Sequence, residues 1–343
     1  MKIKILNFLL CAVFCFSCTA QDENDSVKIV TQRITFNGVE LYNAFTDLVF
    51  FENQFFLVYR ESDKHAYGRD GIIKIFNSLD GKEWKFIKEF SVDGTDLRDP
   101  KFSVNGNRLS VYLHGSVWLN GGVVEFKDFV SEWNKVGWNN LQPVLLDNKK
   151  KETARIKGNE AWPWRVTWYK DVAYSFGYNT KGIFDLYSSQ DGMNFINKGG
   201  YFEKIGAIPS EATIRVDKNG DFYSLVRRNE GPSVLLKSTN KGEKWETIGE
   251  IPIVSIGGPN FVFFKNGLIL SGRDNGKAIL GYFNFSDNLY TKLATLPSSG
   301  DCGYPGMVIK DGYLWISYYS AHENKISTAI YLSKIDLTHI KVP

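Results

Sequence analysis

Three short segments decide the fold of this chain: SLDGKEW at residues 78–84, SQDGMNF at 189–195 and STNKGEKW at 238–245. Each lies between two stretches of alternating apolar and polar residues, which predicts a strand, a tight turn and a second strand. In such a turn the Ser and Asp or Asn side chains bond to backbone N–H groups, and Gly adopts a conformation that other residues resist. The aromatic residue closes the base of the hairpin. We therefore expect these segments to be structural rather than catalytic.

The spacing of the three segments predicts a repeated architecture. They start at residues 78, 189 and 238, and further hairpin patterns occupy 267–285 and 313–335. Intervals close to multiples of about 50 residues are typical of four-stranded blades in a β-propeller. The expected fold is therefore all-β, a single propeller domain over residues 27–343 with about six antiparallel blades. A short alternating strand at 27–34 is expected to join the last blade and close the ring.

The first 26 residues are predicted to be a signal peptide followed by a short tether. Residues 1–17, MKIKILNFLLCAVFCFS, have two lysines, an apolar run and a small residue before Cys18, as in a secretory signal peptide. The small residue followed by Cys18 predicts a lipoprotein whose lipid is carried by that thiol, with residues 18–26 as tether. Plain secretion with cleavage nearby is the alternative. On the first interpretation the protein is anchored at the bacterial envelope, at the surface or periplasmic face of the outer membrane.

Composition excludes several classes of protein. A net charge of +3 in 343 residues gives no broad basic surface for nucleic acid. With Cys11 and Cys15 in the signal and Cys18 lipidated, only Cys302 remains, so no internal disulfide is expected. The four histidines show no metal-ligand spacing, so we expect neither a metal nor a cofactor. The only expected membrane contact is the lipid anchor, and the oligomeric state is left open.

Polar clusters recur about once per expected blade. In a propeller the inner strands converge on a central channel, so polar residues at the starts of these strands are candidates for a binding site. Six segments fit this description: 59–65, 96–101, 162–165, 211–228, 258–273 and 301–323.

These motifs together resemble the sialidase superfamily over nearly the whole mature chain. The turn pattern Ser-x-Asp-(x)-Gly-x-x-Trp, in which the residue between Asp and Gly is optional, resembles the Asp-box, or BNR repeat, of sialidases. Glu211, then Asn219-Gly220, then Arg227-Arg228 resemble the sialidase order of Glu, Asp-Gly and Arg. Gly303-Tyr304-Pro305 is similar to the motif that holds the nucleophilic Tyr. The set as a whole resembles a subgroup of sialidase-like bacterial lipoproteins.

The resemblance implies a retaining exo-glycosidase that acts on a terminal, acidic sugar of a glycan. Tyr304 would attack and Glu211 would take its proton. Asp63 or His65 would protonate the leaving oxygen. Guanidinium groups would hold the carboxylate of the sugar, and an indole could stack on it. The candidate substrate-binding residues are Arg60, Arg98, Asp99, Arg165, Arg215, Arg228, Arg273, Trp162, Asp301 and His322.

One departure weakens the implied specificity. Sialidases begin with an Arg-Ile-Pro motif whose Arg completes the carboxylate clamp, whereas this chain has Asn-Ala-Phe-Thr at 43–46. Arg98 or Arg165 would have to replace it. The substrate class is therefore left open between sialic acid and other sugars.

Two further functions remain alternatives. One is a polysaccharide lyase in which Tyr304 or His65 removes the proton next to a uronate carboxylate. The other is a glycan-binding lipoprotein without activity. The enzyme hypotheses require Tyr304 and Glu211 to meet within hydrogen-bonding reach, with guanidinium groups around them.

Overall fold

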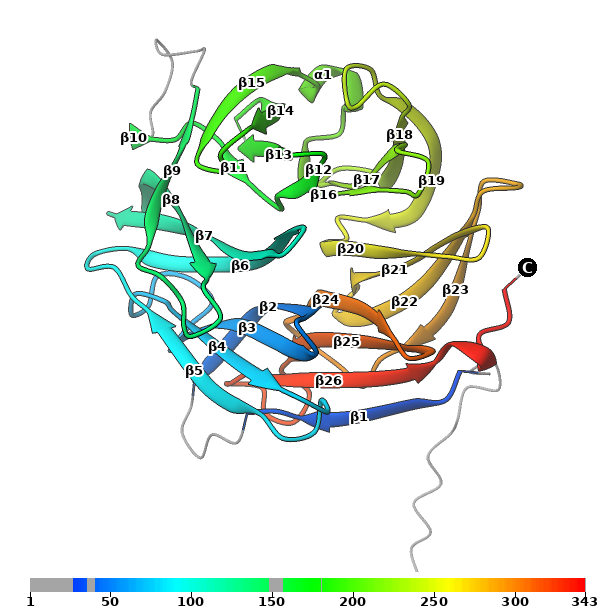
Figure 1. The fold of residues 1–343 in the computed structure, drawn as a ribbon, viewed down its shortest axis with the longest axis horizontal. Coiled ribbons are helices and arrows are strands. Elements are labelled where there is room, and N and C mark those ends of the chain that lie inside the picture. Colours follow the sequence, from blue (N-terminus) through cyan, green and yellow to red (C-terminus); the bar gives the residue numbers. More distant parts are fainter. Residues whose placement is uncertain (1–26, 36–40, 148–156, 180, 343) are drawn as a thin grey trace, which may run out of the picture.

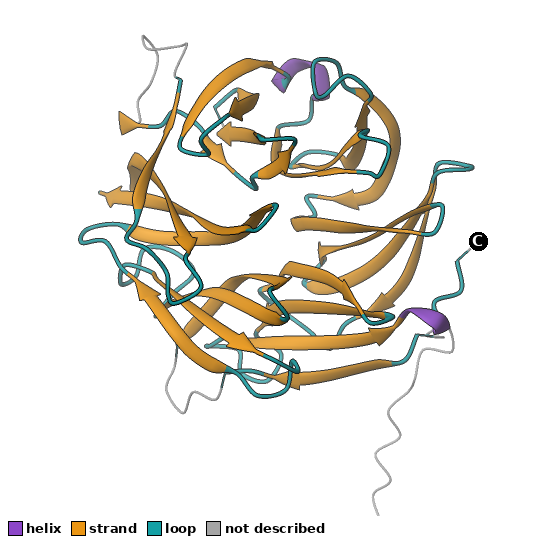
Figure 2. Ribbon diagram, in the orientation of Figure 1, coloured by secondary structure: helices purple, strands orange, loops and turns teal. Residues whose placement is uncertain are grey.

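The computed structural model describes residues 27–35, 41–147, 157–179 and 181–342. The predicted signal peptide and the predicted tether, which begins at Cys18, lie outside these residues. The described chain is all-β and its sheets are arranged radially around a common axis, which is the arrangement of a β-propeller (Figure 1). Only one α-helical turn, α1 (Phe202–Ile205), and one 3-10 turn, η1 (Leu337–His339), interrupt the strands described (Figure 2). Among the described residues no helix has the length and apolarity needed to cross a bilayer.

Four of the sheets contain four antiparallel strands each. Their strands, in the order in which they are hydrogen-bonded, are β2 (Tyr42–Phe51), β3 (Gln54–Ser62), β4 (Ile72–Ser78) and β5 (Lys85–Phe90); β16 (Pro209–Val216), β17 (Phe222–Arg228), β18 (Pro232–Ser238) and β19 (Glu246–Val254); β20 (Gly257–Phe264), β21 (Gly267–Asp274), β22 (Lys277–Asn284) and β23 (Leu289–Thr295); β24 (Cys302–Lys310), β25 (Tyr313–Ser320), β26 (Ala329–Asp336) and β1 (Ile29–Arg33).

The remaining sheet has ten strands and consists of two antiparallel groups. They are joined where β9 and β15 run parallel, with Asn194 opposite Leu145 and Phe195 opposite Leu146. The first group is β6 (Asp96–Asn105), β7 (Arg108–Leu119), β8 (Gly122–Trp133) and β9 (Gln142–Leu146), with β10 (Lys157–Gly158) on β8. The second is β11 (Trp162–Pro163), β12 (Thr167–Tyr169), β13 (Val172–Asn179), β14 (Ile183–Ser189) and β15 (Asn194–Gly200).

The two ends of the described chain meet in one sheet. β1 pairs with β26 in an antiparallel register that runs from Ile29 opposite Ile335 to Arg33 opposite Tyr331. The strand expected at 27–34 therefore completes the C-terminal sheet, as the sequence predicts (Figure 1). This pairing covers an edge of β26 that would otherwise expose unpaired backbone groups.

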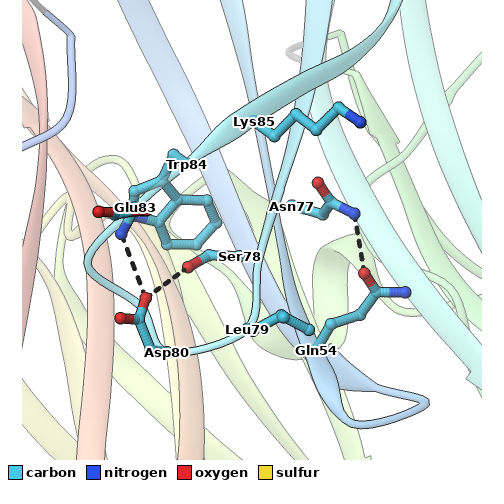
Figure 3. Close-up of a pocket in the computed structure, with 8 residues that line it drawn as sticks. All are labelled: Gln54, Asn77, Ser78, Leu79, Asp80, Glu83, Trp84 and Lys85. Carbon is cyan, nitrogen blue, oxygen red and sulfur yellow. Dashed lines mark hydrogen bonds between the residues drawn. The ribbon is translucent and has the colours of Figure 1, made fainter.

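The three Ser/Gly/aromatic segments form the turns that the sequence predicts. In the first, the Ser78 hydroxyl accepts the Gly81 N–H at 2.9 Å, and Asp80 Oδ1 accepts the Lys82 N–H at 2.8 Å. The same bonds recur in the second turn and, with Asn in place of Asp, in the third. Figure 3 shows the first turn, where Asp80 faces Ser78 and Glu83 beside the Trp84 indole. Each turn thus satisfies its own backbone N–H groups without outside partners.

Hydrophobic packing between neighbouring sheets forms most of the core. Phe56 and Ile75 of one sheet are fully buried against Leu97 and Val111 of the next. The sheets of β16–β19 and β20–β23 share a similar cluster. The inner strands are therefore held firmly around the axis, which fixes the residues at their ends.

Substitution of Gly192 tests this packing. Its φ is +75°, and an added Cβ would lie 2.8 Å from the Trp168 ring and 2.6 Å from the Tyr112 hydroxyl. We expect Gly192→Ala to lower the free energy of unfolding by about 2 kcal/mol or more, since both backbone strain and overpacking apply. Urea denaturation measures it. The control is Gly94→Ala, which has φ +65° but no atom within 4 Å of the new Cβ. An equal loss in the two variants would contradict the packing described here.

Candidate active site

Bulges in five inner strands bring separate sheets together at one end of the axis. Each of these strands contains one extra residue near its start, relative to the strand it pairs with. The five strands are β2, β6, β16, β20 and β24. Four residues at these bulges have left-handed φ: Phe45 (58°), Asp99 (42°), Gly258 (62°) and Tyr304 (53°). Left-handed backbone in non-glycine residues is uncommon and gathers at functional sites.

The bulge residues contact one another between neighbouring sheets. The Phe45 and Tyr304 rings lie 5.0 Å apart, edge to face. A Cβ on Gly258 would lie 2.5 Å from the Cα of Tyr304, so only glycine fits at this crossing. The bulges therefore turn five strand ends into one compact site.

Tyr304 and Glu211 form the centre of this site. The Tyr304 hydroxyl donates to Glu211 Oε1 at 2.7 Å, across 93 residues of sequence. The two residues are 7% and 5% exposed, respectively. The contact that the enzyme hypotheses require is thus present.

Two further donors hold the Glu211 carboxylate. The Gly258 N–H donates to Oε2 at 2.7 Å, and Arg227 Nη1 donates to Oε1 at 3.0 Å. Arg227 is in turn fixed by Asn229 at 2.9 Å and by the Ser255 hydroxyl at 2.8 Å. A buried carboxylate needs such donors, because its charge would otherwise be strongly destabilising.

The environment keeps the Tyr304 phenol protonated at rest. Burial raises its pKa well above the usual value, and the charge of Glu211 raises it further. The charges of Arg227 and Arg273 oppose this and lower the pKa. The phenol can therefore lose its proton only to a base in direct contact, and Glu211 is in that position.

Asp301 organises a second group beside the pair. Arg273 Nη1 and the Tyr319 hydroxyl donate to Oδ1 at 2.6 and 2.8 Å. His65 Nδ1 lies 2.7 Å from Oδ2, and the Tyr42 hydroxyl also bonds to Oδ2. Burial alone would raise the pKa of Asp301, but His65, Tyr42 and Arg273 outweigh it and lower the pKa to about 2.

A third group joins two of the predicted arginines. Asp96 accepts from Arg60 Nε at 2.8 Å and from Arg98 Nη1 at 3.1 Å, and Arg98 also donates to the His65 carbonyl at 2.9 Å. The Arg98 guanidinium lies 4.9 Å from the centre of the Phe45 ring. This aromatic ring stands in the segment where the resemblance would place the first clamp arginine.

The structure corrects the choice between two neighbouring arginines. Arg227, which the sequence analysis did not select, contacts Glu211. Arg228 instead pairs with Glu250 at 2.6 Å and bonds to the Pro232 carbonyl. Successive residues of a strand point to opposite faces, so only one of the two can face the site. The alternation of side-chain direction along β17 is the sequence feature that could have separated Arg227 from Arg228.

Other predicted residues lie apart from the pair. Arg165 binds Asp47 at 2.8 Å, and both line, with Arg215, a separate hollow of about 340 Å³. Asp63 is exposed and accepts the Arg69 N–H of its own loop at 2.7 Å. His322 lies 3.0 Å from the Ser320 hydroxyl and against the Tyr331 ring. These contacts do not bring them to Tyr304.

Trp162 cannot stack on a sugar as the sequence analysis expects, because both faces of its indole are covered. The His114 ring is stacked at 3.7 Å on it and the Tyr178 ring at 5.6 Å. Asp99 is buried beside Arg98 and Lys101, and its Oδ1 has no hydrogen-bond partner among the described residues. Burial raises the pKa of Asp99, and Lys101 and Arg98 lower it.

The described residues contain no metal-like cluster of three or more His, Cys, Asp or Glu side chains. Cys302 is a buried thiol whose pKa burial raises to about 11, although Arg273 opposes the shift. It is therefore protonated at neutral pH and unsuited to nucleophilic attack.

Comparison with known proteins gives the fold. No protein-family model and no curated protein sequence matches the chain. Among solved structures, a protein of unknown function from Dyadobacter fermentans aligns with TM-score 0.71 and 16% identity over 91% of this chain and 99% of its own. Trypanosoma rangeli sialidase in complex with sialic acid aligns with TM-score 0.63 and 13% identity over 86% of this chain. Phage phi92 endosialidase aligns with TM-score 0.66 and 11% identity over 92% of this chain and 70% of its own.

The chain spans about half of the Trypanosoma rangeli enzyme, 54% of its length. At these identities the comparisons show a sialidase-like β-propeller fold.

The two neighbouring arginines give a matched test of the site. Arg227→Ala leaves the buried Glu211 without its cation, and we expect it to lower the free energy of unfolding by about 2–3 kcal/mol. Arg228→Ala removes a pair whose Glu250 side chain is 57% exposed, so less than about 1 kcal/mol should be lost. Urea denaturation of both variants measures the difference. Equal losses would contradict the assignment of Arg227 to the site.

The pKa of Asp301 predicts an acid-dependent contribution to stability. Because its pKa falls on folding from 3.8 to about 2, the carboxylate stabilises the fold above pH 3.8 and loses this contribution as the pH falls toward 2. We expect Asp301→Asn to be less stable than wild type above pH 4.

The difference in unfolding free energy between Asp301→Asn and wild type should narrow as the pH falls from 3.8 toward 2, between the unfolded and folded pKa values of Asp301. Denaturant unfolding at several pH values measures it, with His322→Asn as a control away from the pair. A constant gap at every pH would show that the ionised form is not favoured by the fold.

Proposed function

We propose that this protein is a retaining exo-glycosidase that hydrolyses a terminal sugar from a glycan. The observation that carries the proposal is the buried contact of 2.7 Å between the Tyr304 hydroxyl and Glu211 Oε1, with Arg227 on the same oxygen. A phenol becomes a good nucleophile when a neighbouring base takes its proton. This pair supplies both groups in contact before any substrate arrives.

In the proposed reaction Tyr304 Oη passes its proton to Glu211 and attacks the anomeric carbon. The bond between this carbon and the leaving oxygen breaks, and an acid protonates that oxygen. Water then attacks the anomeric carbon of the tyrosyl-sugar intermediate and gives its proton to the group that acted as the acid. The bond to Tyr304 Oη breaks, Glu211 returns its proton to the phenol, and the sugar leaves with retained configuration. Arg227 and the Gly258 N–H keep the Glu211 carboxyl in place throughout.

His65 is the better candidate for the acid than Asp63. Its ring lies 5.2 Å from that of Phe45, which also packs against Tyr304, and its side chain is 46% exposed. The contact between Nδ1 and Asp301 Oδ2 at 2.7 Å orients the ring. Asp63 bonds within its own loop instead.

The sugar is proposed to be acidic on the strength of Arg227 and Arg273. Arg273 lies 5.6 Å from the centre of the Tyr304 ring. Each of the two guanidinium groups also binds a carboxylate of the chain, Glu211 or Asp301, which reduces its attraction for a second anion. A panel of aryl glycosides with sialoside, uronide and neutral members is therefore the direct test of substrate class.

The wider setting is also proposed. We interpret the ten-stranded sheet as two blades, which gives six blades in total, and the three turns as Asp-boxes. Cys18 would carry a lipid that tethers the domain at the bacterial envelope, where glycans are its substrates. Metabolic labelling with a palmitate analogue, compared between wild type and Cys18→Ser, tests the anchor.

A glycan-binding protein without activity is the second candidate. It is favoured by the 7% exposure of Tyr304, which leaves little of the phenol open to a substrate.

Turnover of the glycoside panel separates the candidates. We expect Tyr304→Phe and Glu211→Gln each to lower kcat at least about a thousandfold, since nucleophile and base act as one unit. Tyr318→Phe, which removes a buried hydroxyl bonded to the Pro297 carbonyl at 3.0 Å, is the control and should retain activity. If wild type cleaves no member, or if Tyr304→Phe cleaves as fast as wild type, the glycosidase proposal is wrong.

A further inference from the structure

A second concave surface adjoins the candidate active site. It is a pocket of about 350 Å³ whose aromatic lining comes from Tyr67, Trp118, Phe126, Trp162 and Tyr178. This volume is at the lower end of small-molecule sites and suits one or two sugar rings. None of the steps proposed above uses the pocket.

The pocket is connected to the catalytic pair through packed rings. Trp162 lies 5.7 Å from Trp164, which in turn lies 5.8 Å from Tyr304. Arg98 lines the pocket and also donates to the carbonyl of His65. Arg98 also lies over the Phe45 ring, which packs on Tyr304, so one or two side chains separate the pocket from the catalytic pair.

Two of the aromatic residues are available for stacking. Trp162 is covered on both faces by His114 and Tyr178 and acts as a fixed wall. Tyr67 is 62% exposed and lies 4.6 Å from the partly exposed Trp118, with the two rings tilted by 57°. Tyr67 lies on a loop and Trp118 near the end of β7, and the exposed face of this pair has no evident role in folding.

The pocket is held in shape by the same carboxylate that binds the arginines. Trp118 Nε1 donates to Asp96 Oδ2 at 3.2 Å, and this oxygen also accepts from Arg98. Asp96 is shared with Arg60, and Asp99 Oδ2 lies 3.9 Å from Arg98 Nε, so Arg98 already has two carboxylate neighbours within the chain. The lining that remains is mainly aromatic, with the Ser116 hydroxyl beside it and Lys181 exposed at the rim.

We propose that this pocket is a subsite for a neutral pyranose ring, the sugar next to the one cleaved at Tyr304. The C–H face of such a ring carries partial positive charge and packs on the negative face of an aromatic ring. A balanced guanidinium and a hydroxyl suit sugar hydroxyls better than a carboxylate. The assignment of the neighbouring position rests on the proposed function, whereas binding of a neutral sugar can be measured without it.

The test is ligand-detected NMR on the Tyr304→Phe protein, in which turnover cannot interfere. Lactose, N-acetyllactosamine and cellobiose serve as neutral probes, with sialyllactose and digalacturonate as charged ones. We expect saturation transfer to the C–H protons of at least one neutral disaccharide. Trp118→Ala and Tyr67→Ala on the same background should each weaken this binding about tenfold.

Phe86→Ala is the control, because Phe86 is a 50% exposed aromatic residue that does not line the pocket. Tyr67 is exposed, so its substitution tests the pocket even if Trp118→Ala fails to fold. Binding of no neutral probe, binding that survives both pocket substitutions, or binding of charged probes alone would each overturn the proposal. Neutral binding in a protein that cleaves no glycoside would support the subsite and reject the glycosidase.

Discussion

The site depends on the burial of one carboxylate. Glu211 is nearly closed to solvent, so each oxygen must be satisfied by donors from the protein. Its donors come from three other strands: Tyr304 on β24, Arg227 on β17 and the Gly258 N–H on β20. Any structure that keeps Glu211 charged must therefore hold these strands in register around it. The same requirement places a phenol in contact with a base.

Backbone geometry makes this convergence possible. The bulges of the inner strands each insert one residue where a flat ladder would continue, and they re-aim the side chain at that point. Phe45, Asp99 and Tyr304 accept left-handed φ there, which costs free energy that the packed sheets must offset. That the same bulge recurs in five strands explains how one architecture supplies an aromatic ring, an acid and a phenol to one place.

The charged groups are organised as balanced pairs rather than as a field of free cations. Asp96 forms salt bridges with both Arg60 and Arg98. Asp301 forms one with Arg273, and Asp47 forms one with Arg165. Such pairing lowers the cost of burying each charge, and it also fixes each side chain. A ligand would therefore meet preorganised donors whose charge is already shared. The paired arginines therefore attract an anionic sugar less strongly than unpaired arginines would.

The sequence by itself determined the strands, the Ser/Asp turns and the closure by β1, because these depend on local alternation and on hydrogen bonds within a few residues. It also selected Tyr304 and Glu211, through motifs that resemble those of a known family. Only the tertiary structure decided that Arg227 and not Arg228 faces Glu211, that the Phe45 ring packs against Tyr304, and that His65 meets Asp301. These contacts join residues from different sheets, and neighbouring side chains of a strand point to opposite faces. Which side chain points toward the axis therefore depends on the strand register and on the position of the bulge. Neither of these can be predicted from a short segment of the sequence.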